Sequence, residues 1–394
     1  MRTRASLRVV LGFSLVTGGL LPSCASETPG QTVASCDDGS GERLFVVASD
    51  GSSSAVGVVS ESKSALASGA DLGGDPRLAS SGGRLFVLAR DFDVLFEFDS
   101  ACGKAVQKRS TGVVAGQGSS NPQDVAVARD GTLWVPKYNV PTIALFSKTG
   151  ASAGSIDLAS FDEDGNPQAG AIAIGDFGGG EKAYVTVQRL DDDKGLRSTR
   201  PSYILRFDVA TRAFEAKLEL KARNPFSRFE RDGDLFYLAS AGDFHATNEP
   251  AAGIEVFDPK SFTSRLLVPE TVLGGSVSQV AVRDGCGAAI VADATSKNRT
   301  ALVTFDATTG AATTTYAAPQ FGPTEGFELW ALTWSGSELY LGDRRRGASG
   351  FPIHRYERKG SAGCALASKG VPLVVPQKPV ALVPMVAPSG LRAQ

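Results

Sequence analysis

One short stretch of the chain decides the fold. Residues 121–135 read NPQDVAVARDGTLWV. A run of small apolar residues is followed by Asp130-Gly131, a pair typical of tight turns, and then by a second apolar run with Trp134 at its centre. Two such runs joined by a glycine-containing turn predict an antiparallel β-hairpin. The small side chains of the first run suit a crowded inner position in a sheet.

This hairpin pattern recurs along the chain. Its second run, which carries an aromatic or bulky residue, begins at Leu44, Leu85, Leu133, Ala183, Leu235, Ala289 and Leu339. A further run follows each of these, and Ile254-Glu255-Val256 shows the apolar–polar alternation expected of a half-buried strand. No long segment has the period of about 3.6 residues of an amphipathic helix. The sequence therefore predicts an all-β chain built from repeats.

The number of repeats indicates the architecture. Seven repeats of roughly 40–60 residues, with about four short strands each, predict a single β-propeller of seven four-stranded blades. In such a ring each blade covers its neighbours, and only short edges stay open. The first and last repeats are irregular, so six or eight blades are alternatives. A β-sandwich followed by a second domain is a further alternative.

The repeats also resemble those of a known group of proteins. Residues 121–135 are similar to the repeats of the bacterial YVTN-type and NHL-type propellers, and Asn166-Pro167 and Asn224-Pro225 open later repeats in the same way. The resemblance covers about residues 32–375. It implies the propeller fold. It does not select one function, because these families include lactonases, lyases and binding proteins.

The composition limits the classes of function. The chain has 394 residues, of which 42% are hydrophobic and 21% charged, as in an ordinary globular protein. The 40 Lys and Arg residues are balanced by 42 Asp and Glu residues, which gives a net charge of −2. No basic excess exists to contact phosphates, so we predict that nucleic acid is not a partner.

The N-terminus is typical of an export signal. Arg2, Arg4 and Arg8 precede an apolar segment, and residues 21–24 read LPSC. This ending resembles the lipobox of bacterial lipoproteins, in which the signal is removed and the cysteine receives acyl chains such as palmitate. An ordinary signal-peptidase site beside an unmodified thiol is the alternative.

The lipobox resemblance implies a place in the cell. Cys24 would become the lipidated N-terminus, and the membrane would be a partner through this lipid. Ala25 stands where Asp often marks retention at the inner membrane, which implies an outer-membrane lipoprotein, on the periplasmic side or the cell surface. We therefore divide the chain into a signal peptide (1–23), a lipidated tether (24–31) and the propeller (32–376). A Pro-rich tail (377–394) is expected to complete the last blade and then cross the surface.

The other cysteines predict disulfides. Cys36, Cys102, Cys286 and Cys364 are an even number in an exported chain. In the repeat frame, Cys36 and Cys286 fall between the first two strands of repeats one and six. Cys102 and Cys364 follow the third strand of repeats two and seven. We predict the pairs Cys36–Cys102 and Cys286–Cys364, each joining neighbouring blades. A single ring-closing bond between Cys36 and Cys364 is the alternative.

The candidate ligand face is the one where long loops surround the mouth of the central channel. Its charged residues, which we take as site candidates, are Arg189, Asp191, Asp193, Arg197, Arg200, Asp243, His245, Asp293, Glu325, Glu328, Asp343 and Arg344. The arginines could hold an anionic ligand, or they could be surface charges balanced by nearby acids. The aspartates could ring the mouth, or they could cap turns. Gln123, Asp124, Gln168 and Gln279 are expected near the channel, where inner strands begin.

No catalytic or metal-binding motif is specific. Residues 191–193 are consecutive aspartates and lack the spacing of a calcium loop, so we predict no cofactor and keep Ca²⁺ as an open alternative. His245 is the one histidine in a long loop and the candidate general base. Glu325 and Glu328 are candidate acids for a lactonase-like metal site. No residue is assigned as catalytic, because no Ser/His/Asp order, phosphate loop or zinc motif occurs.

Three hypotheses of function result. The first is a lipid-anchored, non-enzymatic propeller that binds a ligand, a protein or a glycan in the cell envelope. The second is an exported propeller hydrolase or lyase, lactonase-like, with a metal at the channel mouth. The third is a structural subunit of an envelope assembly. The sequence favours the first and leaves enzymatic activity open.

Overall fold

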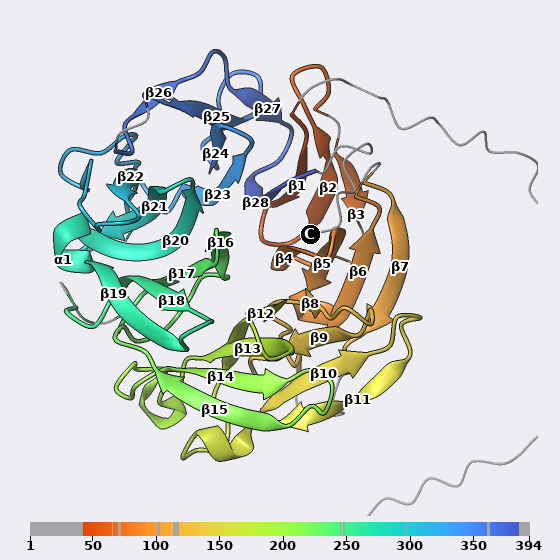
Figure 1. Cartoon of the computed structure of the whole chain (residues 1–394). Coiled ribbons are helices and arrows are strands. Elements are labelled where there is room, and N and C mark those ends of the chain that lie inside the picture. Colours follow the sequence, from red (N-terminus) through yellow and green to blue (C-terminus); the bar gives the residue numbers. More distant parts are fainter. Residues whose placement is uncertain are drawn as a thin grey trace, which may run out of the picture. The chain divides into compact units, whose positions relative to one another are not determined.

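The computed structural model describes residues 42–64, 66–69, 72–100, 103–112, 118–244, 246, 249–296, 298–360 and 363–385. Over these residues the strands form seven antiparallel sheets arranged around a ring (Figure 1). The predicted seven-bladed propeller is thus confirmed, and the alternatives of six blades, eight blades or a sandwich are wrong. The predicted signal peptide and tether lie outside the described residues, as do Cys24, Cys36, Cys102 and His245.

In the first four blades, the strands follow one another from the centre outward. Blade one contains β28 (Pro379–Pro384), β1 (Leu44–Ser49), β2 (Ser54–Val59) and β3 (Ala67–Gly69). Blade two contains β4 (Pro76–Ser81), β5 (Arg84–Ala89), β6 (Val94–Phe98) and β7 (Ala105–Ser110). Blade three contains β8 (Ala126–Val127), β9 (Leu133–Pro136), β10 (Thr142–Phe146) and β11 (Ser152–Asp157). Blade four contains β12 (Ala169–Asp176), β13 (Glu181–Val187), β14 (Tyr203–Asp208) and β15 (Phe214–Glu219).

The last three blades are less regular. Blade five contains β16 (Glu230–Asp232), β17 (Leu235–Ser240), β18 (Gly253–Asp258) and β19 (Thr263–Pro269). Blade six contains β20 (Gly275–Arg283), β21 (Cys286–Asp293) and β22 (Thr300–Asp306), and isolated bridges to β22 replace a regular outer strand. Blade seven contains β23 (Leu329–Ser335), β24 (Glu338–Asp343) and β25 (Phe351–Arg358), with β26 (Leu366–Ser368) and β27 (Leu373–Val375) sharing its outer edge.

Helices are few and short. Among the described residues the only α-helix is α1 (Glu270–Leu273), and the 3₁₀ turns are η1 (Arg90–Phe92), η2 (Ala159–Phe161) and η3 (Asp192–Lys194). Within this described part, no helix has the length and apolar character needed to cross a membrane.

The core lies between the blades. All six residues of β1 are buried, because neighbouring blades cover both faces of its sheet. The aromatic positions of the repeats fill the spaces between blades, and Phe45, Phe86, Trp134 and Tyr184 are at most 2% exposed. Burial of one such side chain stabilises the fold by about 1.5–3 kcal/mol. The repeat pattern in the sequence is therefore the pattern of the core.

The ring is closed by the C-terminal strand. β28 pairs with β1, placing Leu382 opposite Val46 and Val383 opposite Phe45, so it is the inner strand of blade one. The structure thus differs from the expected surface tail, and the segment completes the first blade instead of the last. Its prolines misled the interpretation. Pro379 and Pro384 stand at the two ends of an innermost strand, where a missing N–H is tolerated.

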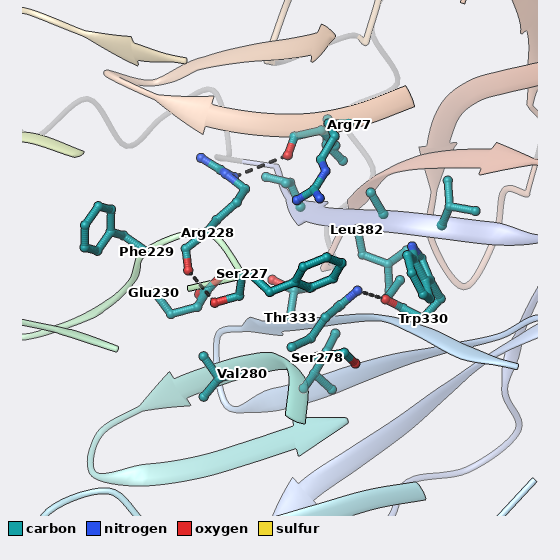
Figure 2. A pocket seen from close by; sticks show the side chains of 18 of the residues that line it. Arg77, Ser227, Arg228, Phe229, Glu230, Ser278, Val280, Trp330, Thr333 and Leu382 are labelled. Carbon is teal, nitrogen blue, oxygen red and sulfur yellow. Dashed lines mark hydrogen bonds between the residues drawn. The ribbon is translucent and has the colours of Figure 1, made fainter. Parts of the chain in front are cut away.

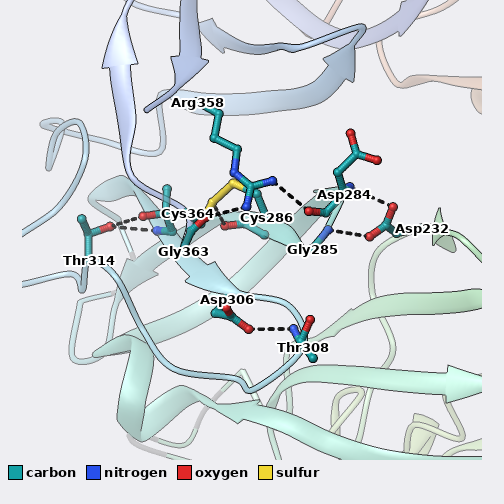
Figure 3. Close-up of a disulfide and its surroundings, with 12 residues drawn as sticks. Asp232, Asp284, Gly285, Cys286, Asp306, Thr308, Thr314, Arg358, Gly363 and Cys364 are labelled. Atoms are coloured by element: carbon teal, nitrogen blue, oxygen red, sulfur yellow. Dashed lines mark hydrogen bonds between the residues drawn. A yellow bond between two sulfur atoms is a disulfide. The ribbon is translucent and has the colours of Figure 1, made fainter. Parts of the chain in front are cut away.

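A disulfide joins blades six and seven. The predicted pair Cys286–Cys364 is confirmed, with 4.7 Å between the Cα atoms and both residues fully buried (Figure 3). The alternative bond Cys36–Cys364 is therefore excluded. Beside the disulfide, Arg358 donates to the carbonyl oxygens of Asp284 and Gly363, at 2.8 and 2.9 Å, and so ties the same two turns together. A buried disulfide indicates a protein that folds outside the reducing cytosol.

Candidate ligand-binding site

The central channel contains a cavity of about 650 Å³. Its wall comes from the inner strands β4, β16, β20, β23 and β28 and from the turns beside them. Figure 2 shows Arg77 and Arg228 reaching the cavity from one side and Ser278 on the other. Gln123 and Gln279, which the sequence placed near the channel, both line this cavity.

The turns that lead into the inner strands position two of the lining residues. Asn121 and Asn224 each precede a proline and adopt left-handed backbone conformations, with φ of 54° and 56°. Asparagine tolerates this conformation better than most residues. In both turns the residue two positions later, Gln123 in one and Phe226 in the other, lines the cavity. The repeated Asn-Pro motif thus serves to aim side chains at the channel.

Two arginines at the cavity are held by acids. Arg228 donates from Nε to Asp124 at 2.8 Å and from a terminal nitrogen to the Leu78 carbonyl oxygen at 3.3 Å. Arg90 forms an ion pair with Asp75 and donates to Gln123 at 3.2 Å. The positive charges of Arg228 and Arg90 are therefore balanced, and their side chains are fixed.

Arg77, on β4, is in a different situation. Its guanidinium lies 5.8 Å from the centre of the Phe226 ring, and among the described residues it has no hydrogen-bond or ion-pair partner. Burial and the neighbouring charges of Arg90 and Arg228 lower the pKa of Arg77 to about 10. Arg77 is charged at neutral pH, and its charge is not compensated by a contacting acid.

Glu230, on β16, is the second ionisable group at the cavity without a printed partner among the described residues. Burial raises the pKa of this carboxyl to about 7, with Arg228 opposing the shift and Asp124 adding to it. The cavity therefore becomes more positive as the pH falls below neutral.

We expect the variant Glu230→Gln to be more stable than the wild type at pH 8 and equally stable at pH 4. The folded-state pKa lies above the ordinary value of 4.5, so folding disfavours the charged form. Stability is therefore lost as the pH rises from about 4.5 through 7, and the loss is complete above 7. The gain at pH 8 is about 1–3 kcal/mol. Calorimetric melting against pH, with the exposed Glu219→Gln as control, checks this. Equal melting temperatures of Glu230→Gln and wild type at pH 8 would contradict it.

Aromatic rings complete the cavity wall. Phe226 contacts Phe244 edge to face at 5.7 Å, and Trp330 contacts Phe327 at 5.2 Å, and of these Phe226, Phe244 and Trp330 line the cavity. Arg344, a predicted site residue, lies with its guanidinium 5.9 Å from the Trp330 ring. The wall thus offers flat apolar surfaces next to positive charge.

The other predicted arginines are engaged in the loops of blades four and five. Arg197 pairs with Asp243 at 2.6 Å, which links the two loops. Arg200 pairs with the buried Asp162 at 2.6 Å. Arg189 donates to the hydroxyl of Tyr203 at 2.9 Å and is itself buried. These contacts match the interpretation of balanced surface charges.

The predicted acids are mostly used locally. Asp191 pairs with Lys194 at 2.7 Å, and Glu325 pairs with Arg299 at 2.7 Å. Asp293 accepts hydrogen bonds from the backbone N–H groups of Thr295 and Ser296 and so caps its own turn. Asp193 is exposed. In Glu328 the backbone is engaged, since its carbonyl oxygen accepts from the N–H of Arg344.

Asp343 forms the most buried of these contacts. Its side chain is 3% exposed and contacts Arg345 at 2.6 Å and His354 at 3.2 Å. Burial alone would raise its pKa, but the hydrogen bonds with His354 and Arg345 lower the pKa of Asp343 to about 2. Of the predicted candidates that fall in the described part of the chain, none lines the cavity itself. In that part, moreover, no three His, Cys, Asp or Glu side chains gather where a metal could bind.

Comparison with known proteins supports the fold. No protein family and no curated protein matches the sequence. A protein from Bacteroides uniformis, named as a candidate 6-phosphogluconolactonase, superposes with a TM-score of 0.54 at 14% identity, over 87% of this chain and 99% of that one. Kuenenia stuttgartiensis hydrazine synthase gives 0.50 at 13% identity, over 71% and 75%. The dihydro-heme d1 dehydrogenase NirN gives 0.50 at 13%, over 86% and 74%. At such identities the likeness shows the fold alone, and the resemblance to YVTN-type and NHL-type propellers stays a prediction.

Proposed function

We propose that this chain is a lipid-anchored protein of the cell envelope whose propeller binds a small molecule in its central channel. The cavity carries this proposal. Its volume of about 650 Å³ falls within the range of roughly 300–1,000 Å³ typical of ligand sites. Its wall combines aromatic rings with two ionisable groups, Arg77 and Glu230, that no contacting protein group satisfies. Such groups are costly to leave without a partner unless water or a ligand reaches them.

The envelope location is supported by two independent features. The first is the LPSC sequence at residues 21–24 after a basic and apolar leader. The second is the Cys286–Cys364 disulfide, which requires an oxidising compartment to form and persist. A lipid on Cys24 would hold the propeller at the membrane, since acyl chains bind at about 0.8 kcal/mol per buried CH₂.

The location is tested with the full chain and the variant Cys24→Ser in a bacterial host. The wild type is expected in the membrane fraction and to incorporate a labelled palmitate analogue. Cys24→Ser is expected to lose the label and to leave the membrane fraction. A wild type that carries no label would contradict the lipid anchor and leave the channel proposal to its own test.

Channel binding is tested by thermal denaturation of the mature protein against a panel of small acids, bases and neutral compounds. A ligand at 100 times its dissociation constant raises the unfolding free energy by about 2.7 kcal/mol. Thr333 lines the cavity, so Thr333→Trp is expected to fill it and abolish any shift. Thr263→Trp, on an exposed outer strand, is the control and should keep the shift. A shift that persists in Thr333→Trp, or the lack of any shift across the panel, would refute binding in the channel.

A further inference from the structure

We propose, resting on the channel-binding function above, that the ligand is a planar aromatic carboxylate whose carboxylate group binds the guanidinium of Arg77. Its aromatic body would lie against the rings of Phe226 and Trp330. The proposal names the chemical class of the ligand, and it depends on three features of the cavity wall.

The first feature is the state of the five arginines at the cavity. Arg90 and Arg228 pair with Asp75 and Asp124. The other two with partners also contact acids or carbonyl oxygens: Arg231 donates to the Gly233 carbonyl, and Arg283 lies 3.7 Å from Asp284. Within the described residues Arg77 is the one lining arginine that has neither a hydrogen bond nor an ion pair. One positive charge is thus left for a ligand.

The second feature is the geometry of that charge. A guanidinium offers parallel N–H groups in one plane, which match the two oxygens of a carboxylate. One face of Arg77 is directed to the Phe226 ring, and its N–H edges point to no protein acceptor among the described residues. The flanking Arg90 and Arg228 add to the positive potential, because both lower the pKa of Arg77. A singly charged anion neutralises the site, whereas a more highly charged one would leave excess charge in a partly buried cavity.

The third feature is the apolar part of the wall. Phe226 lies under Arg77, and Trp330 lines the same cavity beside Leu382 (Figure 2). Aromatic rings prefer offset or edge-to-face partners, with about 0.5–1.5 kcal/mol per pair beyond the area buried. A flat ligand body next to the carboxylate uses these surfaces, whereas a small inorganic anion does not.

The test compares three probes by calorimetry on the mature full-length protein: naphthoate, its neutral analogue naphthalenemethanol, and acetate. Naphthoate is expected to bind saturably, and the other two at least about tenfold more weakly. Arg77→Gln should weaken naphthoate at least about tenfold and leave naphthalenemethanol unchanged, and Arg77→Lys, which keeps the charge but not the planar fork, should fall between.

Arg206→Gln is the matched control, because the Arg206 guanidinium also lies over a ring, that of Phe262, but on β14. It should bind naphthoate as the wild type does. Equal binding of naphthoate and naphthalenemethanol, or unchanged naphthoate binding in folded Arg77→Gln or Arg77→Lys, would overturn the ligand class. If another compound of the panel shifts the melting temperature in a manner that Thr333→Trp abolishes, and naphthoate does not compete with it, only the ligand class fails. If no compound binds, the channel function itself fails.

Discussion

Truncation of the chain after Gln377 is expected to abolish cooperative folding of the propeller. The truncation removes β28 and exposes the inner edge of β1. Leu382, Val383 and Met385, each less than 9% exposed, would be lost from the cores of blades one and two. Three such side chains contribute about 1.5–3 kcal/mol each, and each lost ladder hydrogen bond adds about 0.5–1.5 kcal/mol. The sum is comparable to the whole stability of a typical domain, about 5–15 kcal/mol.

The matched control is truncation after Met385, which keeps β28 and the hydrogen bond from the Met385 N–H to the Arg43 carbonyl oxygen. Near-ultraviolet circular dichroism and thermal melting of both variants measure the effect. We expect a sharp transition for the longer chain and a broad or undetectable one for the shorter. A sharp transition near the wild-type temperature in the shorter chain would mean that the ring closes without β28.

The sequence predicts the blades well because each blade is local. The strands of a blade follow one another closely, so the alternation and turn residues of a segment such as residues 121–135 reflect its own sheet. The turn positions were equally local, which is why the Cys286–Cys364 pair could be predicted from the repeat frame. Ring closure is not local. β28 pairs with a strand at the other end of the described chain, and its prolines indicate a tail when that partner is ignored.

The channel site was harder to predict for a related reason. Charged residues in the long loops attracted attention, but Arg197 and Arg200 balance acids on neighbouring turns. Arg77 and Arg228, which line the cavity, lie in or next to inner strands and were passed over. A usable signal was present. The inner-strand runs at residues 125–127 and 280–282 are small and apolar, so an arginine at the start of other inner strands is an exception to the repeat.

The second large effect is expected from Asp124→Ala. Asp124 is 1% exposed and lies at the start of the inner strand of blade three. One carboxylate oxygen accepts from Arg228, on blade five, at 2.8 Å, and the other from the backbone N–H of Ile172, on blade four, at 3.1 Å. This carboxylate thus connects three consecutive blades at the wall of the channel. Arg228 and Asp124 are 104 residues apart, so no local pattern announces the pair.

The loss in Asp124→Ala has two parts. The Ile172 N–H is left without its acceptor, and Arg228 is left next to Arg77 without a counter-charge. Removing one partner of a fully buried pair costs about 3–5 kcal/mol, and since Arg228 is one-quarter exposed we expect about 2–4 kcal/mol. Asp124→Asn keeps an acceptor oxygen and should lose less. Asp130→Ala, at an exposed turn in the same blade, is the control, with an expected loss of about 1 kcal/mol or less.

Urea denaturation of the single variants and of the double variant Asp124→Ala/Arg228→Leu separates the two parts. If the unpaired arginine carries most of the loss, the double variant is more stable than Asp124→Ala, because the uncompensated charge has been removed. If the blade-to-blade hydrogen bond carries it, the two losses add. Additive losses would mean that Arg228 is held at the channel by the Leu78 carbonyl oxygen and by solvent, and that Asp124 serves the sheet alone. A coupled result would mean that Asp124 is what allows Arg228, Arg90 and Arg77 to share one cavity, with Arg77 as the cation left for a ligand.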